Sequence, residues 1–216
     1  MVRFGTSSPS WTVNQSRVLS QSEIDTVVAK LSAKSQSNLQ DQVKLVIFRL
    51  SVYCGLRANE LCGLNLGEVH LESDFPFLSI RSETAKGGKS REVPILSMVT
   101  VKDLQSWEAY RISQGATDKD PFLCSVTSDT LGHRFSRQGA RNRFKAACKC
   151  LGDERAASLT IHDGRHTCAS MSLHKHVPIA LVRDMLGHSS IAITNTYVGL
   201  FRDGKGMAYN LDLASG

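Results

Sequence analysis

The sequence has few aromatic residues, few prolines and no long hydrophobic run. Of its 216 residues, 6% are aromatic and 5 are proline. The longest unbroken apolar run, from Leu45 to Phe48, is far shorter than the roughly 20 residues that a membrane-spanning helix needs. Residues 1–20 are rich in Ser and Thr and have no apolar core of the kind found in secretory signals. We therefore expect no membrane partner and no secretory signal.

Zinc-binding Cys-x-x-Cys pairs are also missing. The six cysteines stand in apolar, helical-looking surroundings: Cys54, Cys62, Cys124, Cys148, Cys150 and Cys168. This pattern predicts reduced thiols in or near the core of a cytoplasmic protein, and no metal. A site built from Cys148, Cys150 and a histidine remains an alternative, although its spacing matches no common zinc pattern.

What is present is a globular composition with a basic surplus. Hydrophobic residues make up 41% and charged residues 21%, which is enough apolar material to bury a core and excludes wholesale disorder. The length fits one domain with a small appendage. A formal net charge of +6 is compatible with a polyanionic partner.

Hydrophobic periodicity predicts a mostly α domain with a small antiparallel β-sheet, an α+β fold. Ser20 and Glu23 form a capping box that begins the first helix. Two strands with a glycine-containing turn at 85–89 predict a β-hairpin. We expect a linker or remnant at 1–18, a folded domain at 19–200 and a C-terminal tail at 201–216. The expected helices cover about 20–31, 39–54, 58–64, 99–113, 136–151, 163–174 and 178–186, and the strands 77–82 and 91–96.

Much of the basic surplus lies in residues 134–165. This segment has eight basic and three acidic residues, a net charge of +5. On a helix, Arg137, Arg141 and Lys145 share one face. Such a face binds DNA phosphates without reading sequence, and the alternative is an ordinary solvated helix surface.

Five short motifs carry the residues that suit phosphate chemistry. Two guanidiniums can clamp the non-bridging oxygens of a phosphodiester with bidentate bonds, and Arg57 and Arg165 are the expected pair. His188, directly after a helix stop, can donate to the same oxygens. Taken singly, each motif has an ordinary structural explanation. The motif residues are Arg57, Lys86, His162 with Arg165, His188 and Tyr197.

Together and in this order, the motifs resemble the tyrosine recombinase (phage integrase) family over about residues 17–200. The resemblance rests on Gly-Leu-Arg-x-x-Glu-Leu, the hairpin Lys-Gly-Gly-Lys-Ser-Arg-Glu-Val-Pro, His-x-x-Arg-His-Thr, and Leu-Gly-His-Ser-Ser followed by Thr-x-x-Tyr. It implies the catalytic-domain fold of that family and site-specific DNA recombination or integration, as in mobile elements. It also implies double-stranded DNA and other protomers of a tetrameric synapse as partners, and a cytoplasmic, nucleoid-associated location.

The resemblance also implies roles for single residues. Tyr197 would attack phosphorus to give a 3′-phosphotyrosyl intermediate, and Lys86 would protonate the departing 5′ oxygen. His162 would move a proton or orient the phosphate, and Glu60 would orient His162 or the neighbouring backbone. Because the bond energy stays in the covalent intermediate, no cofactor is expected. The expected DNA contacts are Lys89, Arg91, Arg137, Arg141 and Lys145.

Some features depart from the family pattern. Gly164 stands where an apolar residue is usual, and His176 stands where a helix-ending glycine is usual. The N-terminal domain that closes a clamp around DNA is expected to be absent from this chain. Within the tail, residues 201–213 are expected to pack on a neighbouring protomer or on their own domain. Three alternatives remain: a type IB topoisomerase, a silent DNA-binding module, and a metalloprotein using His162, His166, His174 and His176.

Overall fold

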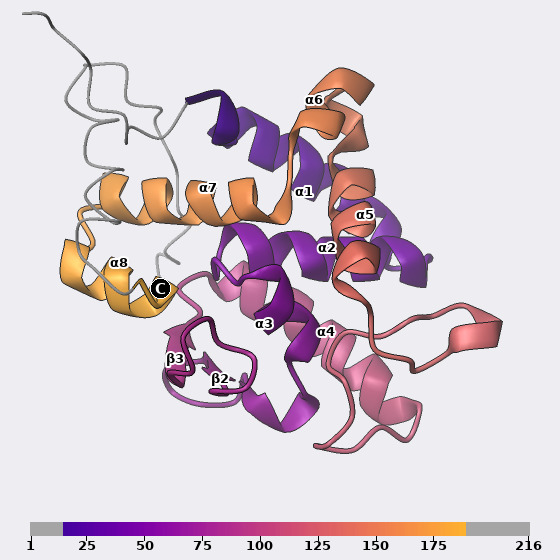
Figure 1. Ribbon diagram of the computed structural model, residues 1–216. Helices are drawn as coiled ribbons and strands as arrows, with labels where there is room; N and C mark the ends of the chain where they lie inside the picture. The colour runs from indigo at the N-terminus through magenta and orange to yellow at the C-terminus, as the bar shows by residue number, and fades with distance from the viewer. Residues whose placement is uncertain (1–14, 189–216) are drawn as a thin grey trace, which may run out of the picture.

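The computed structural model describes residues 15–188 and shows a helical domain with one small sheet (Figure 1). Its elements are η1 (Gln15–Arg17), α1 (Gln21–Ser35), α2 (Leu39–Val52), α3 (Ala58–Gly63), η2 (Leu66–Glu68), β1 (Val69–His70), β2 (Phe77–Ile80), β3 (Arg91–Pro94), α4 (Met98–Ser113), η3 (Ser128–Thr130), α5 (Arg137–Cys148), η4 (Lys149–Leu151), α6 (Asp153–Ser158), α7 (Ile161–His174) and α8 (Ile179–Leu186). The predicted fold class is confirmed.

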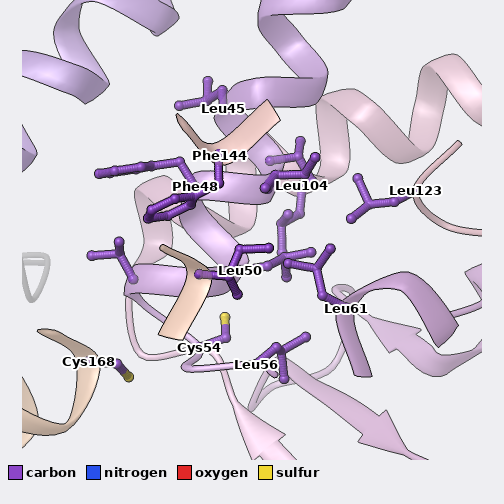
Figure 2. Close-up of a cluster of buried hydrophobic side chains, with 14 of the residues drawn as sticks. Leu45, Phe48, Leu50, Cys54, Leu56, Leu61, Leu104, Leu123, Phe144 and Cys168 are labelled. Carbon is purple, nitrogen blue, oxygen red and sulfur yellow. The ribbon is translucent and has the colours of Figure 1, made fainter. Parts of the chain in front are cut away.

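Helix α2 forms the centre of the fold. It packs against α1, α4, α5 and α7, and Figure 2 shows part of the apolar cluster that surrounds it. Its buried residues run without interruption from Leu45 to Val52, as expected for a helix covered on all sides. Phe48 stacks on Phe144 of α5 with ring centroids 5.8 Å apart. The helices that carry the candidate site therefore rest on a common core.

The sheet contains the predicted hairpin and one strand that was not predicted. The strand order is β1-β2-β3, antiparallel throughout. Leu78 and Ile80 of β2 are buried, whereas Phe77 and Ser79 are half-buried, which matches the period of two in the sequence. Strand β1 has two residues, too few for that pattern to reveal it. The pair Ile80 and Arg91 closes the hairpin, so residues 81–90 form its connection.

The predicted helices are present, with differences at their ends. Ser20 and Glu23 make the predicted capping box of α1. Helix α7 begins at Ile161, two residues before its predicted start, because Thr160 and Asp163 form a second capping box. Helix α6 was not predicted, since its six residues give little periodicity. At the N-terminal side, Val18 is buried and the Arg155 guanidinium bonds its carbonyl, so packing begins before residue 19.

Both departures from the family pattern have a structural explanation. A Cβ atom at Gly164 would lie 3.0 Å from Ser51 Cβ and 3.3 Å from the Phe144 ring, so the glycine lets α7 approach α2 and α5 closely. His176 has a φ of 59° and occupies the left-handed position after α7. The N–H of Val177 then bonds the Ser172 carbonyl, which is the pattern of a Schellman motif.

Candidate phosphate-binding site

Two arginines from different helices meet at the turn that follows α8. Arg57, the residue before α3, donates from Nη2 to the Gly187 carbonyl at 3.0 Å. Arg165, on α7, donates from Nη1 to the Gly55 carbonyl at 2.8 Å and from Nη2 to the Leu186 carbonyl. Arg165 is 1% exposed, whereas Arg57 is half-buried. The predicted pair is thus brought together, with backbone carbonyls fixing both guanidiniums.

Gly187 makes this turn possible. It ends α8 in the left-handed conformation with a φ of 62°, a position that favours glycine. The N–H of His188 donates to the Arg183 carbonyl, which fixes the start of the following segment. The Arg91 side chain lies 3.1 Å from where a Cβ of Gly187 would be, so a larger residue would be both strained and crowded. His188 follows directly, beside the two arginines.

Three histidines share the positive field of these arginines. Burial and the charges of Arg165 and Arg57 lower the pKa of His188 to about 3. Burial, with His162 and Arg17 nearby, lowers the pKa of His166 to about 4, and burial and Arg165 also lower the pKa of His162. The rings of His162 and His166 meet edge to face, with centroids 4.4 Å apart. These shifts favour the neutral imidazole of all three histidines at neutral pH, and a bound anion would raise their pKa values toward the ordinary one.

Glu60 binds two arginines of this region, Arg57 and Arg91. Its side chain is fully buried, and it accepts hydrogen bonds from Arg57 Nη1 at 2.9 Å and from the Arg57 backbone N–H at 2.8 Å. Burial would raise the pKa of Glu60, but the hydrogen bonds and charges of Arg91 and Arg57 hold it below its ordinary value. The expected link to the neighbouring backbone is present. Its side-chain partners within 15–188 are arginines, and no contact of Glu60 with His162 is found there.

The hairpin connection faces the same turn across a groove of about 470 Å³. Lys86 and Lys89 line this groove from the hairpin, and Gly187 and His188 line it from the end of α8. Both lysines are exposed. The fold therefore places Lys86 opposite the histidine, in open surroundings that contrast with the buried arginines.

Arg91, an expected DNA contact, is bonded to protein acceptors in the fold. Its side chain is 10% exposed, and its guanidinium donates to both oxygens of Glu60 and to the Met185 carbonyl. The guanidinium that was expected to face phosphate is thus occupied by protein acceptors. In the sequence, Arg91 is simply the first residue of a returning strand. That position is too general to predict its bonds to Glu60 and Met185.

The basic helix α5 has the predicted faces. Arg137, Arg141 and Lys145 are exposed, and Ala140, Phe144 and Ala147 are buried. Several other cations of the basic stretch bind protein acceptors, so the charge free to meet a polyanion is smaller than the sequence count. These internally bound cations are Arg134, Arg155 and Arg165, and Lys145 also reaches the Ala157 carbonyl.

Asp163 was not singled out in the sequence. It is 1% exposed and accepts from Arg17 Nε at 2.8 Å and from the Thr160 hydroxyl and N–H. This binding fixes the first turn of α7, which carries His162 and Arg165. The Thr-x-x-Asp spacing of a capping box is the signal that could have found it.

Tyr197 and the tail lie outside the described residues, as do residues 1–14. The cysteines are free, and burial raises the pKa of Cys148 and Cys168 to about 12, as expected for inert core thiols. Within residues 15–188, no group of three His, Cys, Asp or Glu side chains is placed to hold a metal ion. No helix in that range is long and apolar enough to cross a membrane.

Comparisons with known proteins give the class of this fold. The Phage integrase family model matches residues 17–202, and the chain belongs to that family of tyrosine recombinases. It is similar to tyrosine recombinase XerD of Lacticaseibacillus casei, with 30% identity over 184 residues, 84% of this chain and 58% of the relative. Tyrosine recombinase XerA of Pyrococcus horikoshii is 28% identical over 160 residues, 74% of this chain and 50% of the relative. The chain thus spans little more than half the length of these curated relatives.

Solved structures share the fold. The crystal structure of XerA recombinase matches with a TM-score of 0.69 and 25% identity, covering 93% of this chain and 65% of that chain. The Tn1549 transposon integrase, solved in complex with transposon right end DNA, matches with a TM-score of 0.62 and 17% identity over 89% of this chain and 62% of that chain. At that identity the second likeness concerns the fold alone.

Proposed function

We propose that this chain is the catalytic domain of a site-specific recombinase that cuts and rejoins double-stranded DNA through a phosphotyrosyl intermediate on Tyr197. Family membership supports the recombinase class. The observation that carries the mechanism is the pair of guanidiniums, Arg57 and Arg165, fixed by backbone carbonyls beside neutral histidines. Donors fixed before the substrate arrives need no reorganisation as negative charge develops on phosphorus.

The proposed cleavage step conserves bonds and protons. The Tyr197 hydroxyl oxygen bonds to phosphorus as the bond from phosphorus to the 5′ oxygen breaks. The tyrosine proton passes to His162, which is neutral because its pKa is lowered, and Lys86 gives a proton to the departing oxygen. His188 donates to a non-bridging oxygen. Rejoining reverses each transfer, with the 5′ hydroxyl of the incoming strand as nucleophile.

DNA is expected to lie over the groove and the exposed part of α5. Lys89 at the groove and Arg137 and Arg141 on the helix would contact phosphates. Helix α5, which carries Arg137 and Arg141, packs against α3, the helix that follows Arg57. A synapse of several protomers on DNA completes the proposal.

The test is covalent capture on a pool of nicked duplexes with a randomised central segment, in which cleavage beside the nick traps the enzyme. We expect the wild-type chain to give adducts that survive denaturation, and Tyr197→Phe to give none. Tyr110→Phe is the matched control, because Tyr110 packs on Trp107 in α4, away from the groove. Failure of the wild type to form adducts, or adduct formation by Tyr197→Phe, would overturn the proposal.

Two further readouts separate the alternatives. A recombinase joins strands from two different duplexes, whereas a topoisomerase relaxes supercoiled DNA and reseals the same strand. We expect joined products from duplexes that carry the captured sequence. A chelator should leave adduct formation unchanged, and strong inhibition by it would indicate a metal-dependent mechanism.

A further inference from the structure

Arg91 joins three parts of the site that are far apart in the sequence. It is the first residue of β3, and its Nη1 and Nη2 atoms donate to the two oxygens of Glu60 at 2.9 Å each. Its Nε atom donates to the Met185 carbonyl of α8, also at 2.9 Å. This is a bidentate ion pair with a third bond to the backbone, and the geometry suits arginine alone among the cations.

Each partner of Arg91 is next to a residue of the candidate site. Glu60 also binds Arg57, so one carboxylate is shared by both arginines. Met185 precedes the turn whose carbonyls bind Arg57 and Arg165, and the Arg91 side chain packs against Gly187 in that turn. On its own strand, Arg91 begins β3 directly after the connection that carries Lys86. Figure 1 shows β3 as an edge strand of the sheet next to α8, which it contacts.

The rest of the connection has one other arginine anchor. Arg81, at its opposite end, donates from Nη2 to the Gly63 carbonyl and pairs with Glu68. Asn59 of α3 also donates from Nδ2 to the Thr84 carbonyl at 2.9 Å. These contacts fix the connection to α3 and leave its orientation toward α8 to the Arg91 side. Lys86 and Lys89 themselves are exposed, so the anchors of the connection set where its lysines lie.

We propose that Arg91 is a positioning residue, which sets the distance of the Lys86 connection from the α8 turn and is not a DNA contact. The inference rests on the proposed function, because it deepens the role of that same site. Replacement of Arg91 would let the connection move relative to the arginine pair. The proton donor would then be misplaced, while the phosphate contacts of Arg57 and Arg165 would remain.

The experiment compares Arg91→Lys with wild type on two matched nicked duplexes that carry the captured sequence. One has the normal oxygen at the scissile 5′ position, and the other has sulfur there. A thiolate leaves without protonation, so the sulfur substrate does not need the lysine acid. We expect Arg91→Lys to slow cleavage of the oxygen substrate by on the order of 10²-fold. The sulfur substrate should restore most of that loss, a recovery that general loosening of the fold would not produce.

Affinity for a mixed-sequence duplex across a salt series provides a second readout that is independent of cleavage. A positioning residue should leave the dependence of log affinity on log salt unchanged. Loss of a phosphate contact would weaken binding to all sequences and reduce the slope by about one. A reduced slope would overturn the inference, as would equal losses on both substrates or no loss on either.

Two variants protect the test against a simple folding defect. Arg49→Lys is the matched control, since Arg49 is 3% exposed and pairs with Asp103 between α2 and α4, away from the groove. Glu60→Gln keeps the shape of the partner and removes its charge, and sulfur should restore only part of its loss because Glu60 also binds Arg57. If wild type forms no adducts, the proposed function fails. If wild type forms them and Arg91→Lys cleaves normally, the positioning inference alone fails.

Discussion

The two sides of the groove are built differently. One side is the turn after α8 with the two arginines bonded to it, where Arg165 is 1% exposed, Arg57 is half-buried and backbone carbonyls fix both guanidiniums. On the other side, Lys86 is exposed on a connection with two left-handed glycines, Gly87 and Gly88. One side is part of the core, and the other is attached to it through Arg81 and Arg91.

The difference matches the chemistry assigned to each side. Groups that stabilise charge on phosphorus act best when they are fixed in advance, because reorganisation costs free energy. A proton donor has to reach a leaving oxygen whose position depends on the bound DNA. The comparison implies that changes on the arginine side affect folding and activity together, whereas changes on the lysine side affect activity alone.

Between the two sides of the groove, the largest expected effect on rate is at Lys86. Replacement Lys86→Ala should reduce the cleavage rate by about 10²–10⁴-fold, the usual contribution of a general acid. Unfolding free energy should change by less than about 0.5 kcal/mol, since the side chain is exposed. Single-turnover adduct formation and thermal unfolding measure the two quantities. Lys89→Ala is the control on the same connection, and a larger rate loss there would move the acid role to Lys89.

Arg165→Lys tests the other side of the comparison. It keeps the charge but leaves the Gly55 and Leu186 carbonyls without their partner, which should cost about 2–4 kcal/mol of unfolding free energy. Loss of one fixed donor should also lower the cleavage rate by about 10²–10³-fold. Denaturant unfolding and adduct formation measure both.

Arg111→Lys is the control for the Arg165 variant, because Arg111 is 4% exposed in α4 and bonds Cys124. Arg111→Lys should lower the free energy of unfolding, but each folded molecule should cleave DNA at the normal rate. A stable, folded Arg165→Lys chain with normal cleavage would contradict the division between the two sides.

Sequence patterns predicted the helical part of this fold and gave the candidate residues of the site as short motifs. Helical periodicity located α2 and α5, and the fold brings Arg57, Arg165 and His188, from three of those motifs, to one place. The sequence patterns could not predict which group each basic side chain binds. Arg91 and Arg137 look alike in the sequence, yet one bonds Glu60 and Met185 and the other is exposed. Such pairings depend on tertiary contacts with residues distant in the chain.

Gly164 is a second case, because nothing local in the sequence reveals how closely α7 approaches α2 and α5 at this residue. Because a Cβ there would lie 3.0 Å from Ser51 Cβ, Gly164→Ala should crowd α7 by about 1–3 kcal/mol against a helix-propensity gain of about 1 kcal/mol. We expect a net destabilisation in thermal unfolding, with lower activity as α7 carries Arg165. Gly139→Ala in α5 is the matched control, since its nearest contact is an ordinary 3.4 Å to Ser136 Oγ, and it should be neutral or stabilising. Stabilisation by Gly164→Ala would contradict the close-approach argument.

The smallest expected effect is the pH dependence of stability that comes from the two histidines near the arginine pair, His166 and His188. The folded pKa values of His166 and His188, about 4 and about 3, lie below the ordinary 6.5. As pH falls below that ordinary value, the unfolded chain binds protons that the folded chain does not, so stability falls until pH reaches the folded values. A bound anion between the arginines would raise both pKa values and oppose this loss. Sulfate should therefore stabilise the fold more at about pH 5.5 than at about pH 7.5, at matched ionic strength in chloride.

The expected extra stabilisation is roughly 2–4 °C in the unfolding temperature, because the histidines are partly exposed and solvent screens their charges. His188→Gln should reduce the extra stabilisation at acidic pH, since it removes the titrating group beside both arginines. His133→Gln is the matched control, because His133 is exposed on the loop before α5. Equal stabilisation by sulfate at both pH values would mean that the anion binds elsewhere. In that case the neutral histidines and the arginine pair would not form one phosphate site, and the contrast between the two sides of the groove would lose its chemical basis.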